Sequence, residues 1–102
     1  MSSDDLWARM RDTEQAMRAT TVQRQALQAQ FAEVEHALNA LPGEGEAWRI
    51  IGNIMVRRDA KALRDELAKR QVALRSRADA AEKQEKDLRE RLDALQRDVV
   101  GA

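Results

Sequence analysis

The N-terminal part of the chain carries an uninterrupted heptad pattern, which restricts the fold more than any other feature of the sequence. No proline or glycine occurs from Asp4 to Leu41, and apolar side chains return at alternating spacings of three and four residues. The expected seam positions are Leu6, Met10, Thr13, Met17, Thr20, Arg24, Leu27, Phe31, Val34, Leu38 and Leu41. This pattern predicts a coiled-coil helix over about residues 4–41, which Pro42 and Gly43 then end.

A second helical pattern follows Asp59, whose carboxylate can cap the first turn, and predicts a helix over about residues 60–99. Its stripe consists of Ala60, Leu63, Leu67, Gln71, Leu74, Ala78, Ala81, Glu85, Leu88, Leu92, Leu95 and Val99. Because the two helices are equally long and the connection is short, we expect them to pair antiparallel in one domain, residues 1–102. Polar seam residues such as Arg24 and Glu85 lower the stability of such a pair but fix its register.

Nearly all bulky β-forming side chains gather in one central stretch, AWRIIGNIMVRRDA, from Ala47 to Ala60. Gly52 and Asn53 can adopt the positive φ angles of a two-residue turn, which predicts a β-hairpin over about residues 47–57. The predicted cross-strand pairs are Ile51 with Ile54, Ile50 with Met55, Arg49 with Val56, and Trp48 with Arg57. Both faces of this hairpin would be apolar.

A lone hairpin of two strands is marginally stable in water, and its unpaired edges invite pairing with another chain. The helices of the same chain can cover only one of its two faces. We therefore expect neighbouring subunits to complete the hairpin. The predicted oligomerisation residues are Trp48, Ile50, Ile51, Gly52, Ile54, Met55 and Val56. The alternative is a hairpin that folds back as a cap on its own helices.

The hairpin sequence resembles that of a known family. An aromatic residue, a basic residue, an aliphatic residue before a glycine, and three aliphatic residues after the next position read here as WRIIGNIMV, from Trp48 to Val56. This segment is similar to the hairpin of prefoldin β-type subunits, and EKQEKDLRERLDAL, from Glu82 to Leu95, is similar to their second helix. The resemblance covers essentially the whole chain.

The resemblance implies both a fold and a function. The fold would be mainly α with a small β part: a long antiparallel two-helix coiled coil joined by a β-hairpin that assembles into an oligomeric β-barrel platform. The assembly would be a hexamer with α-type subunits or with further copies of the chain. Such a co-chaperone works without ATP, holds unfolded polypeptides at its coiled-coil tips and passes them to a chaperonin.

The free end of the coiled coil is the expected client-binding surface. The start of the first helix should lie beside the end of the second, so the predicted client-binding residues are Leu6, Trp7, Met10, Leu95, Val99 and Val100. Trp7 falls beside the seam, where two helices alone cannot bury it fully. Adaptable apolar side chains of this kind suit clients of no fixed sequence. The alternative is that these residues only staple the free end.

Composition argues against several other functions. The 18 basic and 18 acidic residues give a formal net charge of zero, which selects neither nucleic acid nor an anionic membrane. Glu33 and His36 have the Glu-x-x-His spacing of di-metal sites, but no second such motif completes a site. No glycine-rich phosphate loop occurs, and no catalytic residue, metal or cofactor is predicted. The absence of cysteine, of a signal sequence and of a long apolar run favours a cytoplasmic location.

Two alternative functions stay open at this point. Eight basic residues between Arg57 and Arg77 could follow a phosphate backbone, although no aromatic residues alternate with them. The chain could also be a purely architectural coiled coil that oligomerises through the hairpin and binds no client.

Overall fold

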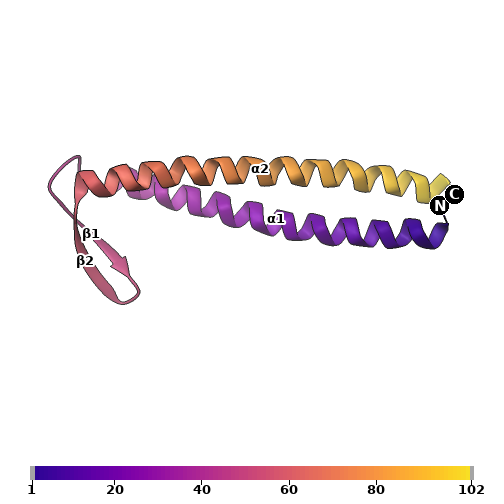
Figure 1. The fold of residues 1–102 in the computed structure, drawn as a ribbon, viewed down its shortest axis with the longest axis horizontal. Coiled ribbons are helices and arrows are strands. Elements are labelled where there is room, and N and C mark those ends of the chain that lie inside the picture. Colours follow the sequence, from indigo (N-terminus) through magenta and orange to yellow (C-terminus); the bar gives the residue numbers. More distant parts are fainter. Residues whose placement is uncertain (1, 102) are drawn as a thin grey trace. The chain divides into compact units, whose positions relative to one another are not determined.

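A computed structural model describes residues 2–101 of the chain. The elements follow in the order α1 (Ser3–Ala40, 38 residues), β1 (Glu46–Ile51), β2 (Ile54–Asp59) and α2 (Ala60–Gly101, 42 residues) (Figure 1). Two long helices with an antiparallel two-stranded hairpin between them make the chain mainly helical, which confirms the predicted fold class.

Side-chain caps at the N-termini of α1 and α2 explain where the two helices begin. At the start of α1, the Asp5 N–H donates to the Ser2 hydroxyl oxygen over 3.2 Å, and Asp4 and Asp5 place negative charge in the first turn. At the start of α2, the Ala62 N–H donates to the Asp59 carboxylate over 2.9 Å, as predicted for this cap. Asp59 is also the last residue of β2, so strand and helix follow each other without a linker.

The chain consists of two compact units, each of which is described by itself. The described part of unit 1 contains residues 2–27 and 77–101, and unit 2 contains residues 28–76. Within each unit, a segment of α1 runs antiparallel to a segment of α2 (Figure 1). The buried residues of unit 1 are Leu6, Thr13, Thr20, Leu27, Ala78, Ala81, Glu85, Leu88 and Leu92. All of them are predicted seam positions.

Unit 2 has its own small core where the hairpin joins the helices. Ala47, Ala60 and Leu63 are buried together, and Leu41 and Leu67 pack against them. The Ala60 N–H donates to the main-chain oxygen of Gly45 over 2.8 Å and thereby ties the start of α2 to the loop before β1. Within residues 2–101, neither helix has an apolar stretch long enough to cross a membrane.

Candidate functional site

The hairpin of unit 2 has the register predicted from the sequence. Ile51 pairs with Ile54, Ile50 with Met55, Arg49 with Val56 and Trp48 with Arg57. Two further pairs, Ala47 with Arg58 and Glu46 with Asp59, extend the strands beyond the predicted limits. Because side chains alternate across a strand, Trp48, Ile50 and Met55 share one face, and Ile51, Ile54 and Val56 share the other.

The turn differs in one respect from the prediction. Gly52 has a φ of 60°. Among the described residues only Gly45 and Gly52 have a positive φ, so the φ of Asn53 is negative. A positive φ at the first central position alone is the pattern of a type II′ turn, in which glycine is favoured at that position. Asn53 therefore does not supply the second positive φ that the Gly-Asn pair suggested.

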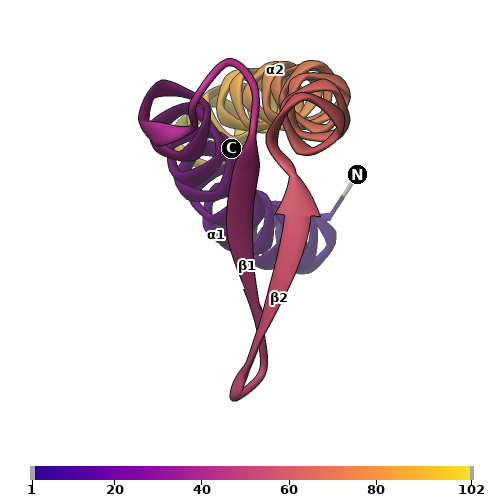
Figure 2. The same cartoon turned by 90° about the vertical axis from the view of Figure 1, so that its left-hand side faces the viewer.

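Most of the predicted oligomerisation surface is open to solvent. Ile50 is 70% exposed and Trp48 56% exposed, and Met55, Ile51 and Ile54 are similarly accessible. The hairpin extends away from the helices of unit 2, with its turn at the far end (Figure 2). Only its base is covered, where Ala47 is buried and Val56 half-buried. The hairpin is thus not a cap on its own helices, and the alternative of a folded-back hairpin is wrong.

An apolar groove that was not foreseen lies beside β1 in unit 2. It encloses about 380 Å³ and is lined by Ala37, Ala40, Leu41, Trp48, Arg49, Ile50, Leu63 and Leu67. Three separate segments contribute these residues, namely the end of α1, the first strand and the start of α2. No periodic pattern in the sequence indicates a groove of this kind, because it depends on how the hairpin leaves the helices. It continues the exposed apolar surface of the hairpin.

Charged side chains fix the base of the hairpin to α2. The carboxylate oxygens of Glu66 lie 2.7 Å from Arg58 Nη2 and 3.3 Å from Arg49 Nη1, so both strands hold the same helix residue. The hydrogen bond from Arg58 and then its charge lower the pKa of Glu66 below the ordinary 4.5, and Arg49 adds to this effect. These groups are partly exposed, so they orient the hairpin more than they stabilise the fold.

The free end of unit 1 brings together part of the predicted client-binding set. A small pocket of about 50 Å³ lies between the start of α1 and the end of α2 and is lined by Ser3, Leu6, Trp7 and Val99. Leu6 is buried at 8% exposure and packs this end together. Met10, Leu95 and Val99 are half-buried.

Two residues at this end offer apolar surface to solvent. Trp7 is 50% exposed, as expected for a residue beside the seam, and Val100 is 87% exposed. The predicted set therefore contains residues that staple the helices and residues that are free to contact another molecule.

Comparison with known proteins relates this geometry to a family. A family model described as prefoldin subunit matches residues 4–100. The chain belongs to the prefoldin family. This is a family of chaperones rather than of enzymes. The match extends over both helices and the hairpin, as the sequence resemblance had indicated.

Similar proteins are β-type prefoldin subunits. The prefoldin subunit beta of Pyrobaculum neutrophilum is 28% identical over 101 residues, which cover 96% of this chain and 80% of that protein. The crystal structure of the prefoldin beta subunit from Thermococcus strain KS-1 has the same fold, with a TM-score of 0.81 at 24% identity. That match covers 95% of this chain and 88% of the other. The predicted likeness to β-type prefoldin subunits is confirmed.

Several basic residues of this prefoldin-family chain, within the run from Arg57 to Arg77, have partners inside the chain. Arg57 Nη1 lies 3.2 Å from the Glu46 carboxylate, Arg58 binds Glu66, and the Arg75 guanidinium lies 6.0 Å from the centre of the Phe31 ring. The run thus combines arginines that have a partner in unit 2 with exposed cations such as Lys61, Lys69 and Arg70.

The acidic residues and His36 do not form a metal-binding cluster in the part of the chain that the structure describes. His36 is exposed on α1, and residues 2–101 contain no group of three or more His, Cys, Asp or Glu side chains arranged to hold a metal ion.

Proposed function

We propose that the chain is a subunit of an ATP-independent co-chaperone, built as one prefoldin β-like domain over residues 1–102. In this proposal the hairpin joins it to other prefoldin subunits, α-type or its own kind, in a hexamer with a β-barrel platform. The free helix ends then hold unfolded polypeptides in the cytoplasm and deliver them to a chaperonin. No catalytic residue, metal or cofactor takes part.

One observation carries this proposal: large apolar side chains stay exposed at two separate places, the hairpin and the free helix end. The surface on the hairpin consists of Trp48, Ile50, Ile51, Ile54 and Met55, and the surface at the helix end includes Trp7 and Val100. Soluble proteins rarely keep a contiguous apolar surface open unless another molecule covers it. Membership of a family of chaperone subunits supports a neighbouring subunit at the hairpin and a client at the helix end.

The test of client binding is suppression of aggregation. A chemically denatured test protein is diluted without ATP in the presence of the chain, and light scattering is followed. We expect the native chain to suppress scattering and the variant Trp7→Ser/Val100→Ser to suppress it much less. The matched control is Val22→Ser/Val72→Ser, which removes two apolar side chains that are 66% and 71% exposed away from this end. This control should behave like the native chain.

Sedimentation first checks that all three proteins assemble alike, so that differences in scattering reflect client binding. If the native chain does not reduce the scattering, the chain is an architectural coiled coil that binds no client. Equal suppression by the two double variants would place client binding elsewhere than at Trp7 and Val100. Binding of a labelled oligonucleotide with a steep salt dependence would instead support the nucleic-acid alternative, because phosphate contacts release counterions.

The mass of the assembly in solution shows whether the chain associates with itself or with an α-type subunit. Sedimentation or native mass spectrometry, alone and with a co-expressed α-type subunit, separates a monomer, an assembly of identical chains and a mixed hexamer. We expect an assembly in at least one of the two preparations.

A further inference from the structure

The seam of unit 1 contains a pair of opposite charges, in which the carboxylate is buried and the guanidinium group is half-buried. Arg24 of α1 and Glu85 of α2 approach to 2.9 Å between Nε and Oε2, with 21% and 9% of their side chains exposed. The other carboxylate oxygen of Glu85 lies 3.3 Å from Arg89 Nη2, and the Thr21 side chain also hydrogen-bonds to this carboxylate. Both oxygens of a carboxylate inside the seam thus have cationic donors, and one of these donors comes from the opposite helix.

The neighbouring polar seam residues do not act across the interface. The Thr13 hydroxyl donates to the main-chain oxygen of Arg9 over 2.8 Å, and the Thr20 hydroxyl donates to that of Ala16 over 2.9 Å. Both acceptors belong to α1 itself, so these two hydroxyl hydrogen bonds would form whichever helix lay opposite. The described side-chain interactions of this seam that depend on which helix lies opposite meet at Glu85, where the charged one comes from Arg24 and a hydroxyl hydrogen bond comes from Thr21.

The two seams carry complementary single charges. Along the predicted seam positions of α1, Arg24 is a cation and no position holds a carboxylate. Along those of α2, Glu85 is an anion and no position holds a cation. Leucine, methionine and alanine at the other positions pack equally well against either helix, and therefore discriminate little between partners.

We propose that the Arg24–Glu85 pair selects which helices pair, so that α1 associates with α2 and not with the same helix of another copy. A parallel α1–α1 pair would bring two Arg24 guanidinium groups together in the seam, and an α2–α2 pair would do the same with two Glu85 carboxylates. A buried charge without its partner is strongly unfavourable, whereas an apolar pair of similar size is accepted. Charge thus supplies the discrimination that the apolar positions lack.

The same pair also fixes the register of α1 against α2. A shift by one heptad would place Arg24 opposite Ala78 or Leu92, neither of which can accept a hydrogen bond from its side chain. If several copies assemble through their hairpins, as proposed above, helices of similar heptad pattern come into close proximity, and selection of this kind then has its largest effect. The selection itself does not depend on client binding.

Cross-linking tests the proposal directly because the chain has no cysteine. Thr20→Cys introduces one reporter thiol into the α1 seam. In a parallel α1–α1 pair, two such residues face each other within the range of a disulfide, whereas α1 paired with α2 has no second thiol opposite. The reporter is placed in the native chain, in Arg24→Leu/Glu85→Leu, and in Arg24→Lys, which keeps the opposite charges. Each protein is refolded from denaturant, oxidised mildly and separated without reductant.

We expect little covalent dimer from the native chain and from Arg24→Lys, and a rise of roughly tenfold or more for Arg24→Leu/Glu85→Leu. Circular dichroism checks that each variant is helical. If the leucine variant is not helical, Arg24→Gln/Glu85→Gln replaces it, since it also removes both charges. Failure of the helical charge-free variant to form more dimer overturns the proposal. Abundant dimer from the native chain overturns it as well.

Discussion

Arg64 of α2 donates a hydrogen bond from its Nη1 atom to the main-chain oxygen of Leu38 in α1, 2.8 Å away. The same atom lies 3.1 Å from the main-chain oxygen of Leu41. The last carbonyl groups of a helix have no partner within it, and the last turn of α1 contains no basic residue of its own. A guanidinium group from the opposite helix therefore caps the end of α1 next to the hairpin.

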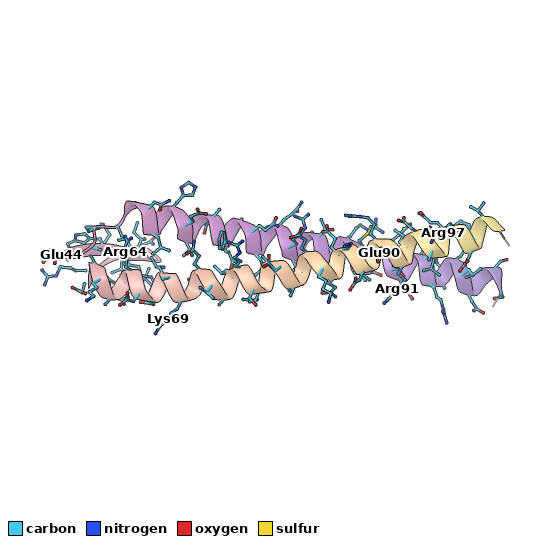
Figure 3. All side chains as sticks on the ribbon, turned by 90° about the horizontal axis from the view of Figure 1, so that it is seen from above. Glu44, Arg64, Lys69, Glu90, Arg91 and Arg97 are labelled. Carbon is cyan, nitrogen blue, oxygen red and sulfur yellow. The ribbon has the colours of Figure 1, made fainter. Side chains whose placement is uncertain are left out.

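Replacing Arg64 by Met should destabilise the chain. The substitution keeps much of the apolar stem but removes a charged donor shared by two carbonyl groups, and we expect a loss of about 1–3 kcal/mol in the free energy of unfolding. Urea unfolding followed by circular dichroism at one fixed protein concentration measures this loss. Lys69→Met is the control, because the Lys69 side chain points away from both helices (Figure 3). Equal stability of the two variants would contradict the capping role.

Introducing charge at the exposed end of the hairpin should dissolve the assembly. In Ile51→Asp/Ile54→Asp, a cross-strand pair of carboxylates replaces the apolar pair that we expect neighbouring subunits to cover. Because an interface buries charge only at high cost, association should weaken by about a hundredfold or more, while helicity is largely kept. Sedimentation velocity measures the assembly. Val22→Asp/Val72→Asp adds the same charge outside the hairpin and should assemble normally, and an unchanged mass for the hairpin variant would refute the predicted interface.

Gly52→Val should harm the hairpin through its backbone alone. A Cβ atom at Gly52 would meet no atom within 4 Å, so the substitution creates no collision. The φ of 60° is nevertheless a conformation that β-branched residues resist, and we expect a cost of about 1–2 kcal/mol together with weaker assembly. Gly43→Val is the matched control, since Gly43 also has open space around it but does not have a positive φ. Similar losses in the two variants would show that the turn geometry is not the cause.

Glu85 should make stability depend on pH in acid. The hydrogen bond from Arg24 is the largest cause that lowers its pKa below the ordinary 4.5, with help from Thr21 and from the charges of Arg24 and Arg89. Between the lowered folded value and 4.5 the unfolded chain binds more protons, so this contribution is complete above 4.5 and is lost as the pH falls through the folded value.

The measurement is the free energy of unfolding as a function of pH for the native chain and for Glu85→Gln. We expect the difference between the two curves to be constant near neutrality and to shrink as the pH falls below 4.5, because the unfolded carboxylate gains its proton before the folded one does. A difference that stays constant down to pH 3 would show that Glu85 is not held in its charged form by the fold.

The sequence predicts the main elements of this fold well, because each of them follows from a local or periodic rule. The heptads require two helices, Pro42 and Gly43 end the first helix, and the Gly52-Asn53 pair centres the hairpin in its observed register. The alternation of side chains also correctly predicts that Trp48, Ile50 and Met55 share one face of the hairpin. These features need no information about contacts between distant parts of the chain.

Features that depend on distant contacts were not predictable in this way. The cap that Arg64 places on α1 and the groove beside β1 arise from the angle at which elements meet in unit 2. At the free end, heptad position correctly separates Leu6, which is buried in the seam, from Trp7, which lies beside it and is half exposed, but it does not indicate which of the two contacts another molecule. Arg24 and Glu85 were expected to lower the stability of the seam while fixing its register, and the structure adds the direct contact between the two side chains.

The junction at Asp59 has a mechanical consequence for unit 2. Asp59 ends β2 and its carboxylate caps α2, so no free peptide lies between ribbon and helix to act as a swivel. The other strand is joined to α1 through the longer connection of residues 41–45, which includes two glycines. We therefore expect a tilt that a neighbour imposes on the ribbon to reach the first turns of α2 more directly than it reaches α1.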